Sequence, residues 1–166
     1  MILTVHILTG AAILAKTQNP ILGFLFAFLS HFVLDTIPHQ QYPVNNITGR
    51  QWQESKADFL KIVLDLLLGF LIVLFLICFI SQGQSFTSEK QLQIFLGGFS
   101  GVLADAFTLL YFLFPKIKFL EMFYNFHQKI HIFNFKNETS PTFLRKVGLG
   151  SQILISFISI YFLLPR

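Results

Sequence analysis

The chain is poor in cysteine and in charged residues. It has a single cysteine, Cys78, and charged residues make up 12% of its 166 positions. One cysteine excludes an intrachain disulfide framework and a thiolate metal cluster, so any metal would need histidine and carboxylate ligands. The low charge, with 54% hydrophobic residues, 22 phenylalanines and a mean hydropathy of +0.65, excludes an ordinary soluble domain. The composition therefore predicts a small polytopic membrane protein.

Long apolar runs divide the chain into predicted helices. A helix that crosses a bilayer needs about 20 mainly apolar residues. Four runs meet this requirement, at residues 20–38, 62–80, 92–114 and 147–164. A shorter run over residues 1–15 lacks the basic segment that begins a signal peptide, so we interpret it as a short first helix. The sequence predicts an all-α fold, with one transmembrane domain over residues 1–166 and about five membrane helices.

An interfacial helix is predicted in the 116–146 loop. There Ile117, Leu120, Phe123 and Tyr124 stand at helical spacing, interleaved with lysine and glutamine. This pattern is typical of a helix that lies in the membrane surface. No run of lysine or arginine is dense enough to follow a phosphate backbone, which argues against a nucleic-acid partner.

Basic residues predict the orientation of the bundle. With five crossings, the N-terminus and the loops 40–61 and 116–146 share one side, which carries nine of the twelve lysines and arginines. The positive-inside rule places that side in the cytoplasm. We therefore expect an integral protein of a prokaryotic cytoplasmic membrane, with a cytoplasmic N-terminus.

Ionisable residues gather at one depth of the predicted bundle, near its cytoplasmic side. His31 and Asp35 stand four residues apart, so on a helix they share a face and can reach one metal ion or one substrate. A charged group at the middle of a membrane helix costs about 2.5 to 3.5 kcal/mol on insertion scales. The set comprises His6, His31, Asp35, His39, Asp65, Asp105, His127 and His131. Each pair alone also fits an ordinary hydrogen bond or a solvated face, but their common depth favours a functional site.

These residue types predict metal-assisted hydrolysis. Imidazole and carboxylate suit zinc, with manganese or iron as alternatives, and a bound cation activates water and stabilises charge on a phosphoryl or acyl oxygen. The predicted metal ligands are His6, His31, Asp35 and Asp105, with His127 and His131 either completing the shell when the loop folds over or binding a phosphate at its rim. The predicted catalytic residues are Asp65, as ligand, bridge or base, and His39, at a rim that binds phosphate. The expected substrate is a membrane lipid or a lipid-linked phosphoester or ester near the cytoplasmic leaflet.

Three short motifs carry a family resemblance. They are Val5-His6-Ile7-Leu8-Thr9-Gly10-Ala11-Ala12, Ser30-His31-x3-Asp35-x2-Pro38-His39 and Gly101-Val102-Leu103-Ala104-Asp105. Together they resemble the small integral-membrane proteins described as membrane-bound metal-dependent hydrolases, including the LexA-regulated inner-membrane type. The resemblance implies that His6, His31 and Asp35 belong to the metal site.

The chain departs from that family's pattern in two places. It lacks the family's Gly-His-Arg-Gly-x-Thr-His-Ser segment, and Gln40 or Gln41 stands where related small proteins often carry an acidic residue. A lost ligand would leave a single metal ion where relatives hold two, or no catalysis.

Two other classes of function remain open. A metal-ion or proton transporter would also cluster aspartate and histidine, but it needs polar groups through the whole membrane. The outer half here offers mainly hydroxyls and amides, such as Thr17 and Ser156. A non-catalytic interaction protein would use the polar residues to join helices, with Gly97, Gly98 and Gly101 permitting close approach. Such couplings average below about 1 kcal/mol, so eight ionisable residues are a costly way to join helices.

Overall fold

The chain folds into helices joined by short connections. The computed structural model describes residues 2–80, 87–131 and 142–164, and among them it has seven α-helices and no strand. The helices are α1 (Leu3–Lys16), α2 (Pro20–Asp35), α3 (Asn45–Thr48), α4 (Lys56–Phe75), α5 (Ser88–Leu113), α6 (Lys118–Ile130) and α7 (Thr142–Leu163). A π-helical turn, η1 (Leu76–Ile80), follows α4. The predicted all-α class is confirmed for this part of the chain.

Three helices are long and apolar enough to cross a membrane, fewer than the five predicted. They cover Lys56–Cys78, Ser88–Leu113 and Lys146–Leu163. The first two apolar runs form shorter helices of 14 and 16 residues. At 1.5 Å per residue these are about 21 and 24 Å long, below the roughly 30 Å of a hydrocarbon core.

The turn between α1 and α2 separates the first two apolar runs and fixes the start of α2. Asn19 caps α2, because its side-chain oxygen accepts hydrogen bonds from the backbone N–H groups of Ile21 and Leu22, at 3.0 and 3.2 Å. Pro20 is the first residue of α2, a position that proline favours. These residues end the first apolar run before it reaches spanning length.

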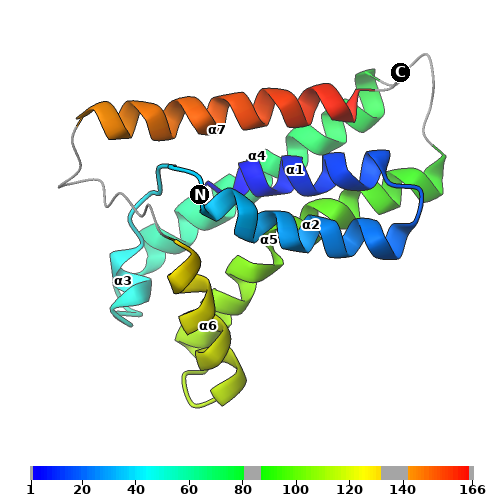
Figure 1. Cartoon of the computed structure of the whole chain (residues 1–166). Coiled ribbons are helices and arrows are strands. Elements are labelled where there is room, and N and C mark those ends of the chain that lie inside the picture. The colour runs from blue at the N-terminus through cyan, green and yellow to red at the C-terminus, as the bar shows by residue number, and fades with distance from the viewer. Residues whose placement is uncertain (1, 81–86, 132–141, 165–166) are drawn as a thin grey trace.

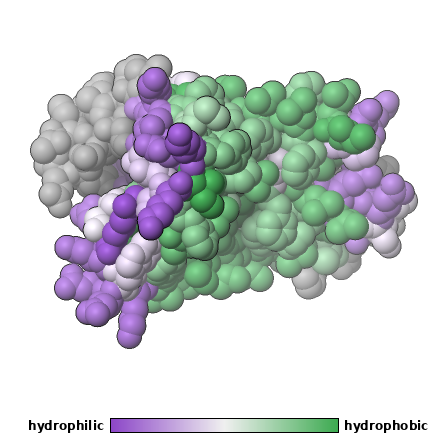
Figure 2. All heavy atoms as spheres, turned by 90° about the horizontal axis from the view of Figure 1, so that it is seen from below, coloured by the Kyte–Doolittle hydropathy of each residue, from purple (hydrophilic) through white to green (hydrophobic). Residues whose placement is uncertain are grey.

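The helices lie side by side, with polar residues at the two ends of the bundle. Figure 1 shows α1 beside α2 and α7, with α3 and α6 at the end where the chain starts. In Figure 2 hydrophilic residues gather at both ends of the visible face, and an apolar surface lies between them. Large apolar side chains are exposed along this surface, for example Ile21 at 79% and Phe157 at 67%. This distribution is typical of helices whose sides face lipid.

Helix α1 lies at the centre and packs tightly on α5. Ten of its fourteen residues are buried. A Cβ atom on Gly101 of α5 would clash with the carbonyl oxygen of His6, and one on Gly10 with the carbonyl oxygen of Gly97. Only glycine permits such an approach of two helix backbones. The contact brings His6 on α1 close to the part of α5 that carries Asp105.

A helix, α6, is present in the loop where the interfacial helix is predicted. It covers Lys118–Ile130 of the 116–146 loop, and residues 132–141 of that loop lie outside the described residues. Two of its residues, Leu120 and His127, are buried against the bundle. Helix α6 thus adds one histidine to the polar cluster that α1, α2 and α5 form.

Candidate metal centre

Seven histidine and aspartate side chains come together at one end of the bundle. They are His6 from α1, His31 and Asp35 from α2, Asp105 from α5, His127 from α6, and His39 and His131, which follow α2 and α6. Five of the seven residues are at most 1% exposed. The structure therefore brings together all six predicted metal ligands and one of the two predicted catalytic residues.

The carboxylate of Asp35 lies at the middle of the cluster. Its Oδ2 atom is 2.9 Å from Nε2 of His127, 3.0 Å from Nε2 of His31 and 3.2 Å from Nε2 of His131. Its Oδ1 atom is 3.4 Å from Nε2 of His6. Two ligands of a tetrahedral zinc ion, with bonds of about 2.0 to 2.1 Å, stand about 3.3 Å apart. The spacing of these atoms therefore suits a shared cation.

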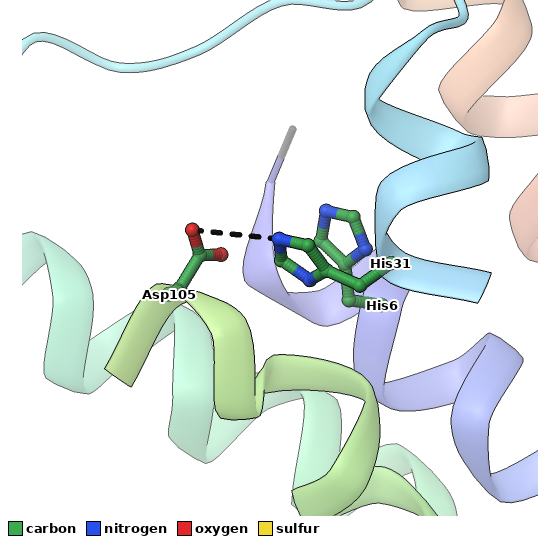
Figure 3. Close-up of side chains that lie close together, drawn as sticks. All are labelled: His6, His31 and Asp105. Atoms are coloured by element: carbon green, nitrogen blue, oxygen red, sulfur yellow. Dashed lines mark ion pairs between the residues drawn. The ribbon is translucent and has the colours of Figure 1, made fainter. Parts of the chain in front are cut away.

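Asp105 lies on the open side of the cluster. Its Oδ1 atom is 3.7 Å from Nε2 of His31, and its side chain is 31% exposed, against 1% for Asp35. Figure 3 shows Asp105 facing the ring of His31, which stacks on the ring of His6 with 4.0 Å between centroids. Asp105 is therefore the carboxylate that a molecule from outside the bundle can approach.

Backbone carbonyl groups accept hydrogen bonds from the Nδ1 atoms of two of the histidine rings. Nδ1 of His31 donates to the carbonyl oxygen of Gly101 at 2.8 Å, and Nδ1 of His39 donates to that of Ile37 at 2.7 Å. Because a carbonyl oxygen can only accept, Nδ1 carries the proton in both rings. In the neutral ring, Nε2 then carries a lone pair. In His31 this lone pair points at the carboxylate of Asp35.

Thr108 orients His127 in the same way. The Thr108 hydroxyl donates to the carbonyl oxygen of Ala104 at 3.2 Å, so Oγ1 is left to accept from Nδ1 of His127 at 2.8 Å. Nε2 of His127 therefore also presents a lone pair to Asp35. Outer-shell hydrogen bonds of this kind orient metal-bound histidines in proteins.

The inner atoms of the cluster are acceptors without enough donors. Nε2 of His127 lies 3.1 Å from Nε2 of His31 and 3.2 Å from Nε2 of His131, and all three face one carboxylate oxygen. A proton on one Nε2 atom would turn one of these acceptor–acceptor contacts into a hydrogen bond. Protonating all three rings would place three positive charges close together in a buried site. A divalent cation uses every lone pair at once. The donor set therefore fits a metal ion.

Two of the histidines have ring nitrogens without a hydrogen-bond partner among the described residues. These buried atoms are both ring nitrogens of His6 and Nδ1 of His131. Unpartnered buried polar atoms are rare, and each calls for an explanation. A cation beside Asp35 would take up Nε2 of His6. Burial also lowers the pKa of His131 to about 4, so at pH 7 this ring is neutral and able to bind a metal.

Three overlapping sets of ligand atoms lie close enough to hold an ion. They are His6, His31 and Asp105; His31, Asp35 and His127; and Asp35, His39 and His131. Within each set, the ligand atoms lie within 4.8 Å of one another. His31 and Asp35 each belong to two sets. Buried histidine and aspartate groups in this protein could therefore hold a metal ion.

Asp65, the other predicted catalytic residue, lies outside these sets and binds the start of α1. Its Oδ2 atom accepts from the backbone N–H of Leu3 at 2.7 Å, and its Oδ1 atom accepts from the backbone N–H and the hydroxyl of Thr4, at 3.0 and 2.6 Å. The first N–H groups of a helix have no acceptor within the helix. Asp65 supplies one from α4, and it thereby holds the turn of α1 that carries His6.

Sequence reasoning overlooked Thr108 as an orienting group, because threonine is not a preferred metal ligand. The available signal was spacing, since Thr108 follows Asp105 by three residues and shares its helix face. The role of Asp65 as a cap on another helix has no sequence signal.

Comparisons with known proteins found no match, whether to a family model, a curated protein or a solved structure.

Proposed function

We propose that this protein is a membrane-embedded, metal-dependent hydrolase that cleaves a lipid or lipid-linked phosphoester or ester. The observation that carries the proposal is the convergence of the Nε2 lone pairs of His31 and His127 on Asp35 Oδ2, at 3.0 and 2.9 Å. The motif resemblance to membrane-bound metal-dependent hydrolases supports the same class.

We also propose that the chain crosses the membrane five times. In this arrangement α1 and α2 cross it in addition to the three long helices. Helix α1 contacts α2, α4, α5 and α7. A helix enclosed by others meets little lipid and can be shorter than the bilayer core. Helix α2 exposes apolar side chains along its length, such as Phe26 at 51% and Val33 at 63%. The excess of basic residues supports a cytoplasmic N-terminus, in a prokaryotic cytoplasmic membrane.

The residues of the centre have distinct proposed roles. Zinc is the ion we propose, with manganese or iron as alternatives, because imidazole and carboxylate are common zinc ligands; when bound, the ion would activate water and stabilise charge on a phosphoryl or acyl oxygen. Asp35 and the histidines around it would hold the ion. Asp105 would face the substrate, because it is the partly exposed carboxylate of the cluster. The contacts of Asp65 support a positioning role at the start of α1.

The location of the centre supports a lipid substrate. Its residues come from the end of the bundle where α1 begins and α2 ends, and at the ends of the bundle polar residues border the apolar surface (Figures 1 and 2). In a membrane, this boundary meets the headgroups and ester groups of lipids. A hydrolytic centre there can reach the polar bonds of a lipid while the acyl chains stay in the apolar layer.

Metal content and hydrolysis test this proposal. Purified protein is analysed for zinc, manganese and iron, and assayed for hydrolysis of a phospholipid and a prenyl phosphate with and without a chelator. We expect a stoichiometric metal, activity that the chelator abolishes, and loss of both in His31→Ala and Asp35→Asn.

Ser159→Ala is the matched control. It removes a buried hydroxyl that pairs with Thr9 at 3.0 Å between α1 and α7, away from the cluster. It should keep the metal. Protein without metal, or hydrolysis that the chelator does not affect, would refute the proposal. Metal uptake into vesicles without hydrolysis would favour a transporter.

A further inference from the structure

Helix α6 has three faces with different chemistry. The face toward the bundle carries Leu120 and His127, both buried. At 100° per residue, Phe119, Met122 and Phe126 fall on a second face, and they are 54%, 65% and 52% exposed. The third face is polar and exposed. A helix that meets protein, apolar surroundings and water on three sides is suited to a membrane surface.

Two lysines mark the border between the apolar and the polar face. Lys118 and Lys129 are eleven residues apart, close to three full turns, so they point in nearly the same direction. Lysine at such a border can lay its apolar stem along the membrane and reach phosphate with its ammonium group. Neither lysine has an ion pair within the described part of the chain.

A shallow, open hollow lies between exposed side chains of α6 along this border, and we call it the groove. It is lined by residues of α6 alone: Lys118, Glu121, Met122, Asn125, Phe126 and Lys129. Two lysines against one glutamate leave the groove positively charged. The two lysines are about 16.5 Å apart along the helix axis, at 1.5 Å per residue, which is too far for one phosphate to bridge. The groove therefore suits a surface that offers several anionic groups beside apolar chains.

The outer face of α6 borders the apolar surface of the bundle. Figure 2 views the molecule from the side on which α6 lies in Figure 1, and shows hydrophilic residues next to the apolar surface. A free phosphate would leave Met122 and Phe126 in water. A lipid headgroup with its chains would cover both kinds of side chain.

We propose that this outer face of α6 binds the headgroups of anionic phospholipids. The proposal rests on the membrane setting given with the proposed function, and it does not require hydrolysis. Lipid binding by α6 would also affect the metal centre. The helix that meets the lipid surface also carries His127 into the metal centre and places His131 beside it, so lipid binding would hold these two histidines in place.

The test measures lipid preference in the full-length protein. Detergent-solubilised protein is titrated with short-chain phosphatidylglycerol or phosphatidylcholine, and bound lipid is counted by native mass spectrometry. We expect the anionic lipid to bind more tightly. Each lysine near an anionic surface contributes about fivefold in binding, and one headgroup can reach only one of the two lysines, so Lys118→Gln with Lys129→Gln should reduce the preference at each by roughly fivefold.

A control variant removes the same charge elsewhere. Lys56→Gln with Lys146→Gln takes two exposed lysines from the first two turns of α4 and α7, and it should keep the preference. Equal binding of the two lipids by the unmodified protein would overturn the proposal. So would an equal loss in the control, or full competition by inorganic phosphate. Analysis of the same samples for zinc, manganese and iron separates the two proposals, because absence of all three metals overturns the hydrolase while the lipid preference is still measured.

Discussion

Replacing Thr108 by valine tests whether an outer hydrogen bond orients His127 for metal binding. Valine keeps the shape of threonine but removes the oxygen that accepts from Nδ1 of His127 at 2.8 Å. His127 is 1% exposed, so its N–H group would lose its partner in a buried site. The ring would then be free to rotate or to change tautomer, and its Nε2 lone pair would no longer be held toward Asp35.

The expected magnitude follows from two general values. A buried donor left without a partner costs about 1 to 3 kcal/mol. Loss of an outer-shell partner of a metal-bound histidine weakens metal binding about 10- to 100-fold. We therefore expect Thr108→Val to bind zinc about 10- to 100-fold more weakly. Thr108→Ser keeps a hydroxyl at this position and should bind zinc close to the unmodified protein.

Zinc affinity is measured by competition with a chromophoric chelator on purified protein. Thermal unfolding with excess zinc shows whether each variant is still folded. Thr108→Val with unchanged zinc affinity would refute the reasoning, and so would Thr108→Ser binding as weakly as Thr108→Val.

The remaining predictions concern the supports of the centre. Gly101→Ala should lower the melting temperature and cost about 1 to 3 kcal/mol, because the added Cβ meets the carbonyl oxygen of His6; a melting temperature equal to that of the unmodified protein would contradict this. Asp65→Ala should destabilise the fold by about 2 kcal/mol, since the first N–H groups of α1 lose their acceptor, yet bind zinc at full stoichiometry when zinc is in excess. Loss of bound zinc in that variant would instead indicate that Asp65 is a metal ligand, as the sequence predicted. Lys90→Met should cost about 1 kcal/mol in chemical unfolding and leave zinc affinity unchanged, because its ammonium group binds two carbonyl oxygens at the other end of α1, at 2.7 and 2.8 Å.

Part of the candidate centre could be predicted from local spacing. His31 and Asp35 are four residues apart in α2, and Nε2 of His31 lies 3.0 Å from Oδ2 of Asp35. His131 directly follows α6, four residues after His127, and the Nε2 atoms of these two rings are 3.2 Å apart. Four-residue spacing places side chains on one helix face, so contacts of this kind follow from sequence. The same rule cannot predict how α6 turns toward α2, because this depends on packing between residues far apart in the chain.

Composition and periodicity alone determined that this protein is helical, rich in apolar surface and supplied with histidine and aspartate ligands. Tertiary structure decided that Asp35 lies at the middle of the cluster, that Thr108 orients His127, and that Asp65 caps α1. The physical reason is the distance along the sequence over which each kind of interaction acts. Helix formation and side-chain spacing depend on neighbours within a few residues, whereas the meeting of side chains from four helices in one cluster depends on the close approach of α1 and α5 at glycine and on the packing of α6 against α2.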